Sequence, residues 1–349
     1  MPLLLDTASF GSALDLRSAN CLTIGLVNNM PDPAFEATER QFINVIRAAT
    51  QNVVVRLKLF AIPDVPRTAA MRQEFAERYR DINALWETPL DGLIVTGTEP
   101  RAPQLTAEPY WATLAALVDW ARDNTASTVW SCLAAHAAVL RADGVERRPL
   151  KDKLFGVFDC AFAADHPMTQ HLRVPLPVPH SRHNALAERD LAACGYRILS
   201  RSDLAGVDCF ARHDRSFFLF FQGHPEYEAV TLLREYRRDV GRFLKGERDN
   251  YPALPQSLFD DGATRLAEAF RDYALANRRD DVLGEFPTAG LETGLDSTWH
   301  AGAVGIYEKW IEYLRARKAE GRPLGVPQRR VWRDWPVHAA RAASDRRVP

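Results

Sequence analysis

The alternation of short apolar runs with amphipathic stretches over the first 150 residues most constrains the fold of this chain. The run "LTIGLV" at 22–27 is apolar and partly β-branched, which is typical of a buried strand. The stretch 35–49 that follows has the apolar spacing of a helix. The same pair recurs, with strands predicted at 53–60, 91–97 and 127–131 and helices at 69–82, 110–124 and 133–142. Continuous apolar strands separated by helices predict an α/β fold, a mostly parallel sheet flanked by helices.

The pattern changes after residue 150. Short β-like pieces alternate with turn residues up to about residue 220, which predicts antiparallel strands beside the parallel sheet. Beyond residue 250 a turn-rich segment precedes further helical periodicity. We therefore expect a domain over 1–250 and a helical C-terminal extension, 251–349, that packs on it. The later helices are predicted at 226–246, 263–277 and 301–319.

Charge and cysteine content exclude several classes of function. The chain has 44 basic and 45 acidic residues, so no net field draws it to nucleic acid or to an anionic membrane. The Arg-rich end after residue 320 lacks interleaved aromatic residues and is interpreted as a solvated tail or packing flap. No apolar run is long enough to span a bilayer, and the N-terminus lacks the features of a signal peptide. The five scattered cysteines predict neither a zinc site nor a disulfide framework, and they fit a reducing cytoplasm.

Cys132 follows the predicted strand 127–131 and precedes a predicted helix. In open α/β sheets, chemistry gathers beyond the carboxyl ends of the strands, and the start of a helix favours a thiolate. A nucleophilic cysteine is therefore one interpretation. A small buried hydrophobic residue is the other, and Ser131 could be the nucleophile instead.

His224 and Glu226 lie on either side of Pro225, directly after the apolar stretch "RSFFLFFQG". Proline is typical of the first turn of a helix, which predicts a second strand-to-helix turn here. A thiolate nucleophile needs a neighbouring imidazole, and the imidazole needs a carboxylate to fix its tautomer. Cys132, His224 and Glu226 supply this set, unless His224 is only a surface residue on a capped helix.

Several stretches together resemble the homoserine O-acyltransferase family, the homoserine transsuccinylases. They extend in order from about residue 20 to about residue 245, and the last of them is the most specific. The stretches are "VNNMPDPAFEATERQF", "DGLIVTG", "YW" at 110–111, "STVWSCLAAHAAV", "KLFGVF", "PHSRH" and "GHPEYEAVTLLREYRRD".

The resemblance implies a class I glutamine-amidotransferase-like fold with a Cys–His–Glu triad. In this chain Cys132 would be the nucleophile, His224 the base and Glu226 the orienting acid. Backbone N–H groups would stabilise the oxyanion. These donors are expected at Leu133 and at Gly97 or Thr98. The homoserine site would be lined by Arg238, Arg182 and Ser181.

Two positions depart from the family pattern. The family usually carries a lysine soon after the "MP" motif, whereas this chain has Pro31, Asp32 and Pro33 there. In the loop after "TG", one position is Gly in family members that transfer succinyl and Glu in members that transfer acetyl. This chain has Arg101 at that position. A guanidinium can pair with the free carboxylate of a succinyl group, which favours succinyl. A solvent-facing Arg101, or one that meets a CoA phosphate, is the alternative.

The resemblance implies a methionine-biosynthetic enzyme that transfers succinyl from succinyl-CoA to the hydroxyl of L-homoserine. We expect a succinyl-cysteine intermediate, no metal, no bound cofactor, a cytoplasmic location and a homodimer. The alternatives within the same triad are acetyl-CoA as donor, serine as acceptor, or glutamine amide hydrolysis. A non-catalytic binding protein with the same fold is the alternative from another class.

Overall fold

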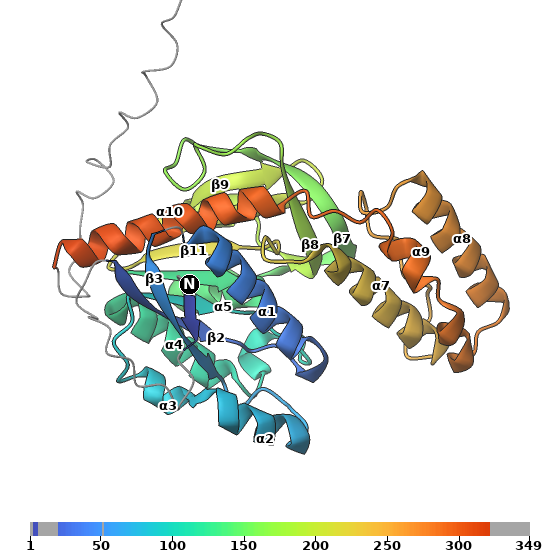
Figure 1. Ribbon diagram of the computed structural model, residues 1–349, viewed down its shortest axis with the longest axis horizontal. Helices are drawn as coiled ribbons and strands as arrows, with labels where there is room; N and C mark the ends of the chain where they lie inside the picture. The colour runs from blue at the N-terminus through green and yellow to red at the C-terminus, as the bar shows by residue number, and fades with distance from the viewer. Residues whose placement is uncertain (1–2, 6–19, 51, 322–349) are drawn as a thin grey trace, which may run out of the picture.

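The computed structural model describes residues 3–5, 20–50 and 52–321, and its centre is one mixed sheet (Figure 1). The sheet has eleven strands in the order β1-β3-β2-β5-β6-β11-β10-β9-β7-β8, with β4 paired to β3. The strands are β1 (Leu3–Leu5), β2 (Cys21–Val27), β3 (Val54–Ala61), β4 (Arg80–Asp81), β5 (Gly92–Val95), β6 (Ser127–Ser131), β7 (Arg148–Phe162), β8 (Leu176–Ala185), β9 (Arg197–Ser202), β10 (Gly206–His213) and β11 (Phe217–Phe221).

The helices alternate with the strands in the first half of the chain and gather at its end. The α-helices are α1 (Asp32–Ala49), α2 (Ala69–Arg78), α3 (Ile82–Leu85), α4 (Trp111–Asn124), α5 (Leu133–Asp143), α6 (Glu188–Ala193), α7 (Ala229–Leu244), α8 (Asp261–Ala276), α9 (Thr288–Glu292) and α10 (His300–Ala319). Two short 3-10 helices, η1 (Leu105–Ala107) and η2 (Asp280–Glu285), complete the set. None of the helices in the described part of the chain is long and apolar enough to cross a membrane.

The predicted parallel sheet is confirmed. Strands β1, β3, β2, β5, β6 and β11 all pair in parallel. Every residue of β2, β5, β6 and β11 is buried, as continuous apolar strands covered on both faces should be. In the β6–β11 pair Ser131 lies opposite Phe221, so both strands end at the same edge of the sheet.

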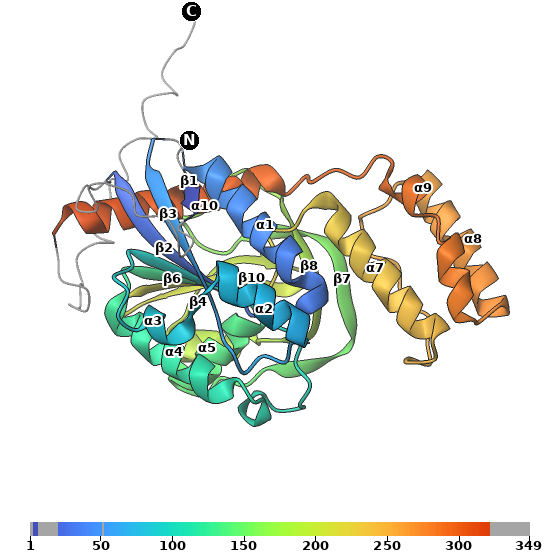
Figure 2. The same cartoon turned by 60° about the horizontal axis from the view of Figure 1, so that its bottom comes forward.

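The predicted antiparallel addition is also confirmed. Strand β10 pairs antiparallel with β11 and β9, and β7 pairs antiparallel with β9 and β8. The long strands β7 and β8 bend away from the parallel half and flank its carboxyl edge (Figure 2). Side chains from this addition can therefore reach the edge at which the parallel strands end.

Helices cover both faces of the sheet. Helices α1 and α10 lie together on one face, over a core that includes Phe42, Ile306 and Trp310 (Figure 1). The indole N–H of Trp310 donates to Ser127 Oγ at 2.8 Å, which fixes α10 against β6. Helices α3, α4 and α5 pack on the opposite face around a second core. The helical C-terminal extension predicted from sequence therefore includes α10, which covers one face of the sheet.

Helices α7, α8 and α9 form an arm that projects from the sheet (Figures 1 and 2). Tyr236, Phe243, Phe270 and Phe286 belong to the core of this arm. The Asp260 carboxylate accepts the N–H of Ala263 at 2.8 Å and caps the start of α8. The domain boundary at residue 250 stays a prediction, since α7 packs with the extension helices α8 and α9. The Arg-rich end after residue 321 lies outside the described residues.

Candidate active site

Cys132 is the single residue between β6 and α5, and its backbone conformation is one that residues other than glycine rarely adopt. Its φ is 52° and its ψ is −115°, and it is the N-cap of α5. Such a conformation costs about 1–3 kcal/mol and is typical of functional sites. The N–H of Cys132 donates to Phe221 O at 2.7 Å, which holds the turn against β11. The strained turn leaves the Cys132 side chain half-buried at the edge of the sheet.

Ser131, the alternative nucleophile, is buried and its hydroxyl lies against Glu226. It is only 2% exposed, and its Oγ lies 3.4 Å from Oε1 of Glu226. Ser131 is the last, buried residue of β6, whereas Cys132 lies on the turn after it and is half-buried. The geometry favours Cys132 over Ser131 for this role.

His224 lies on the turn that follows β11, the neighbour of β6. The N–H of His224 donates to Pro179 O at 2.8 Å. A Cβ on Gly223 would come within 2.6 Å of Val178 and 2.7 Å of Asp208, so glycine is required for this close approach. The turn is therefore packed against β8 and β10, and it brings His224 to the same edge of the sheet as Cys132.

The helix predicted to begin at residue 226 begins at Ala229, and this prediction was wrong by three residues. The reason is the contact between His224 Nδ1 and Glu226 Oε1, which lie 2.9 Å apart. Residues two apart on a helix do not face each other, so this contact requires a non-helical turn. Pro225 consequently lies in the turn and not in the first turn of α7.

The structure brings Cys132, His224 and Glu226 together. Burial by itself would lower the pKa of His224. The charges of Cys132 and Glu226, and side-chain hydrogen bonds to both, instead raise that pKa well above its ordinary value of 6.5. His224 and Glu226 are both buried. The imidazole therefore lies between a thiol and a carboxylate, as a nucleophile–base–acid set requires.

Backbone donors lie beside the Cys132 turn. Gly97 follows β5, and a Cβ built there would be 2.9 Å from the Leu133 nitrogen. Glycine at this position leaves the first N–H of α5 uncovered. The preceding Thr96 is held in place because Asn29 N donates to its Oγ1 at 2.8 Å and the Asn29 amide donates to its carbonyl at 3.1 Å. Thr98 is half-buried beyond Gly97. The predicted oxyanion donors therefore share one corner, and their role stays a prediction.

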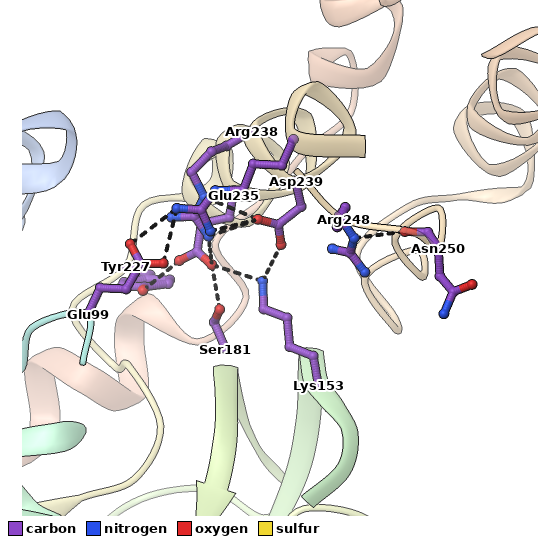
Figure 3. Close-up of polar contacts among 10 residues, drawn as sticks. Glu99, Lys153, Ser181, Tyr227, Glu235, Arg238, Asp239, Arg248 and Asn250 are labelled. Atoms are coloured by element: carbon purple, nitrogen blue, oxygen red, sulfur yellow. Dashed lines mark hydrogen bonds and ion pairs between the residues drawn. The ribbon is translucent and has the colours of Figure 1, made fainter. Parts of the chain in front are cut away.

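A second cluster, of charged side chains, joins β7, β8 and α7 (Figure 3). Lys153 Nζ lies 2.8 Å from Asp239 Oδ2 and 3.4 Å from Glu235 Oε2. Arg238 Nη2 lies 3.1 Å from Asp239 Oδ1, and the Ser181 hydroxyl donates to Glu235 Oε2. Arg238 is 40% exposed, whereas Lys153 is 16% exposed. We call Lys153, Ser181, Glu235, Arg238 and Asp239 the charged cluster.

The basic side chains of the charged cluster favour the ionised form of both its carboxylates. Burial raises the pKa of Glu235, but Lys153 and Arg238 outweigh it and lower that pKa below 4.5. The pKa of Asp239 is lowered in the same way, by the charge of Lys153 acting against burial. Arg242 also pairs with Glu99 at 3.0 Å at the margin of the cluster. Positive and negative groups therefore balance, which suits a zwitterionic ligand better than an anion.

Tyr227 connects the triad to the charged cluster. Its ring is stacked on the ring of His224, with centroids 4.2 Å apart and planes inclined by 16°. Its hydroxyl donates to Glu235 Oε1 at 2.8 Å (Figure 3). The indole N–H of Trp299 donates to the Tyr227 carbonyl at 2.7 Å. One side chain thus touches the candidate base and a carboxylate of the cluster.

Comparison with known proteins decides the family. The family model described as homoserine O-succinyltransferase matches residues 12–320. The chain belongs to the homoserine O-succinyltransferase family. A homoserine O-succinyltransferase of Rhodopseudomonas palustris is 50% identical over 294 residues, which cover 84% of this chain and 88% of the relative. One of Bradyrhizobium japonicum is 48% identical, with 84% and 90% covered. The family resemblance drawn from the motifs is therefore confirmed.

Solved structures similar to this homoserine O-succinyltransferase family member include glutamine amidotransferases. A glutamine amidotransferase of Thermotoga maritima is 10% identical, with 84% of this chain and 98% of that chain covered and a TM-score of 0.43. The glutaminase domain of a Trypanosoma brucei CTPS, with bound acivicin, is 15% identical, with 68% and 98% covered and a TM-score of 0.42. The α/β class expected from the sequence is shown by the strand order and by the parallel pairing of the strands in this chain.

Arg182, expected at the substrate site of this family member, lies beneath it. It is 4% exposed, and its Nη1 donates to Asn184 O at 2.8 Å. Its Nη2 donates to Ala205 O and its Nε lies 3.3 Å from His180 Nδ1. Burial lowers the pKa of Arg182, while the charge of Cys132 acts to raise it, which places the guanidinium near the candidate nucleophile. A direct contact between Arg182 and substrate stays a prediction.

Arg101 lies on the loop that connects β5 to α4 and has an exposed side chain. Its backbone N–H and that of Ala102 donate to the buried carboxylate of Glu108, at 2.5 and 2.6 Å. The backbone is therefore fixed while the guanidinium is open to solvent. A contact with the succinyl carboxylate stays a prediction.

Sequence reasoning missed Lys153, Tyr227, Glu235 and Asp239. A signal existed for part of this set, because residues 235, 238 and 239 are three and four apart and share one face of a helix. Tyr227 lay within the most specific motif but carried no assigned role. Lys153 gave no local signal, since it reaches α7 across the fold from β7.

A cleft of about 390 Å³ lies beside Glu226, the candidate orienting acid, between α1 and the start of α10. Glu226 and Tyr227 contribute to its wall, and Cys132 does not. Glu228, the residue after Tyr227, also lines this cleft. It pairs with Arg40 at 2.7 Å. The residues that line it are Gln41, Val45, Glu226, Tyr227, Glu228, Asp296, Ser297 and His300.

Proposed function

We propose that this member of the homoserine O-succinyltransferase family acts by a ping-pong route through a succinyl-cysteine at Cys132. In the first half-reaction the Cys132 thiolate attacks the thioester carbonyl of succinyl-CoA. The C–S bond to CoA breaks, and His224 gives its proton to the departing CoA thiolate. The N–H of Leu133, with that of Gly97 or Thr98, donates to the oxyanion. The contact of His224 with both Cys132 and Glu226 supports this assignment.

In the second half-reaction homoserine replaces CoA. His224, now neutral, takes the proton of the homoserine hydroxyl as the oxygen attacks the succinyl-cysteine carbonyl. The C–S bond to Cys132 breaks, and O-succinylhomoserine leaves with the thiolate and the protonated imidazole restored. Glu226 holds His224 in the tautomer that directs Nε2 to the reaction, since its Oε1 lies 2.9 Å from Nδ1.

The charged cluster is the proposed site for the amino-acid head group of homoserine. Arg238 and Lys153 would bind its carboxylate, and Glu235 would bind its ammonium. The balance of charge in the cluster supports this assignment, because a zwitterion can replace contacts without leaving a charge unpaired. Ser181 would keep Glu235 oriented through its hydroxyl. This assignment extends the expected roles of Arg238 and Ser181 and adds Lys153.

We place succinyl-CoA as the donor, with the guanidinium of Arg101 pairing with the free succinyl carboxylate. The exposed Arg101 side chain on a fixed loop supports this placement. We also place the reaction in the cytoplasm, where the five unpaired cysteines would remain reduced. A homodimer stays a prediction.

The proposal is tested by the intact mass of the enzyme after mixing with succinyl-CoA alone. We expect the mass of one succinyl group to be added to the wild type and not to Cys132→Ala. A panel of succinyl-CoA and acetyl-CoA with homoserine and serine then identifies donor and acceptor. Turnover without any adduct would refute the covalent route, and a preference for acetyl-CoA or serine would select the corresponding alternative. Ammonia release from glutamine would favour amide hydrolysis, and inactivity with every acyl-CoA would favour a binding protein.

A further inference from the structure

Tyr227 makes a pair of contacts that the triad alone does not require. Its ring is stacked on the His224 ring, with centroids 4.2 Å apart, and its hydroxyl donates to Glu235 Oε1 at 2.8 Å. Glu235 accepts the Ser181 hydroxyl and lies 3.4 Å from Lys153 Nζ. The candidate base and the candidate amino-acid site are therefore joined through one rigid aromatic side chain.

We propose that Tyr227 is a positioning residue that couples the homoserine site to the catalytic base, its ring orienting His224 and its hydroxyl orienting Glu235. This inference rests on the proposed function, because it takes His224 as the base and Glu235 as a homoserine ligand. Tyr227 acts through these two residues and needs no contact with the reacting atoms.

The direction of the Tyr227 hydrogen bond is fixed by its surroundings. Burial, followed by the charges of Glu235 and Glu226, raises the pKa of Tyr227 well above 10. The phenol therefore stays neutral and donates its proton, and the ionised Glu235 accepts it. A hydrogen bond to a charged acceptor is stronger than one between neutral groups, and this one holds Glu235 in one rotamer.

The backbone of Tyr227 is also held, from outside the turn. Trp299 is fully packed at the start of α10, and its indole N–H donates to Tyr227 O at 2.7 Å. The Tyr227 N–H donates to His224 O at 3.1 Å within the turn. Tyr227 is therefore held at its ring by His224, at its hydroxyl by Glu235 and at its backbone by Trp299. A residue fixed at its ring, hydroxyl and backbone can hold two groups in a constant relation.

The two contacts of Tyr227 serve different half-reactions, which makes them separable. The ring contacts His224, which works in both half-reactions. The hydroxyl contacts Glu235, which works only when homoserine is bound. Tyr227→Phe removes the hydroxyl and keeps the ring, whereas Tyr227→Leu removes both. A role in general packing would affect both half-reactions alike.

The experiment measures the half-reactions separately by rapid mixing. Acylation is the burst of CoA released from succinyl-CoA without homoserine, and transfer is the decay of the succinyl-enzyme on adding homoserine. For Tyr227→Phe we expect acylation within about twofold of wild type and kcat/KM for homoserine about 10–100-fold lower, the fold-change that follows from losing one charge-assisted hydrogen bond. For Tyr227→Leu we expect acylation to fall at least tenfold as well.

Tyr236→Phe is the matched control, because Tyr236 is a buried tyrosine of α7 whose hydroxyl bonds to Tyr251 at 3.4 Å. We expect it to leave both half-reactions unchanged. Equal losses in both half-reactions for Tyr227→Phe, or no loss in either, would overturn the inference. So would a Tyr227→Leu enzyme that acylates at the wild-type rate. A wild type that forms no succinyl adduct would instead refute the proposed function, whatever the variants do.

Discussion

Nδ1 of His224 lies 2.9 Å from Oε1 of Glu226, although only Pro225 separates the two residues. This contact is made within a turn that delays the start of α7 to Ala229. The second carboxylate oxygen of Glu226 is buried and has no hydrogen-bond partner among the described residues. Oε1 therefore contacts the imidazole and, at 3.4 Å, the hydroxyl of Ser131, which suits an orienting acid.

Glu226→Gln should lower kcat by about 10²–10⁴, because an amide can present its N–H to Nδ1 and select the wrong tautomer of His224. The measurement is steady-state turnover with succinyl-CoA and homoserine. Glu228→Gln is the matched control, since Glu228 lines the same cleft but pairs with Arg40 at the surface. Comparable losses in the two variants would argue against a specific role for Glu226.

Gly97→Ala should slow acylation by about 10²–10³, the effect of losing one oxyanion donor. The added Cβ would lie 2.9 Å from the Leu133 nitrogen and would cover its N–H. The CoA burst measures this rate directly. Gly284→Ala is the control, because a Cβ there meets nothing within 4 Å. A Gly97→Ala enzyme with a normal burst would exclude Leu133 as a donor.

Lys153→Met should reduce kcat/KM for homoserine about tenfold or more while the CoA burst stays near the wild-type rate. The lysine is held between Asp239 and Glu235, and its loss would remove the proposed charged contact to the substrate carboxylate. Lys309→Met serves as control, since Lys309 pairs with Glu312 on the outside of α10. A reduced burst with normal use of homoserine would place Lys153 at the acyl-CoA site instead.

Arg101→Ala should lower kcat/KM for succinyl-CoA by about tenfold, as expected for the loss of one ion pair with a carboxylate. Acetyl-CoA has no free carboxylate, so its kcat/KM should not change. The ratio of the two constants is the measurement. Equal losses with both donors would indicate a contact with the CoA moiety, and no loss would mean that Arg101 faces solvent.

His136→Gln should make folding less sensitive to acid. His136 is buried against Gln222, and burial, followed by the charge of Arg182, lowers its pKa to about 3. A lowered histidine pKa means that the unfolded chain binds the proton first, so stability is present above pH 6.5 and is lost as the pH falls from 6.5 toward 3.

In that window His136 contributes a slope of about 1.4 kcal/mol per pH unit to the free energy of unfolding. Urea denaturation of wild type and His136→Gln at several pH values between 4 and 8 measures the difference in slope. We expect the free energies of unfolding of wild type and His136→Gln to differ by a constant amount above pH 7. Below that pH the free energy of the wild type should fall more steeply, so that the two curves converge. Parallel curves throughout would mean that His136 titrates alike in the folded and unfolded chain.

Much of the fold could be predicted from local pattern. The strand predicted at 127–131 is β6 to the residue, and the other strands and long helices differ mainly at their ends. Buried strands and amphipathic helices differ in the spacing of apolar residues, which is a property of the nearby sequence alone. The strand β1 was not predicted, because three leucines carry no period and are placed only by pairing with β3.

Only part of the candidate site could likewise be predicted from the sequence. His224 and Glu226 belong to one turn, and Arg238 lies on the helix that follows, so a single stretch of sequence presents them. The sequence could not show that Arg182 is buried beneath the site, nor that Lys153 reaches across from β7 to α7. Those positions depend on which strands lie side by side.

The sequence by itself determined the alternating strands and helices, the two turns at strand ends and the residue types that those turns carry. Only the tertiary structure decided that β6 and β11 are neighbours in the sheet, with Ser131 opposite Phe221. Parallel neighbours end at the same edge, and this brings Cys132 to His224 from distant parts of the chain. Pairing between strands is a long-range choice set by the packing of the whole core, which no local period encodes.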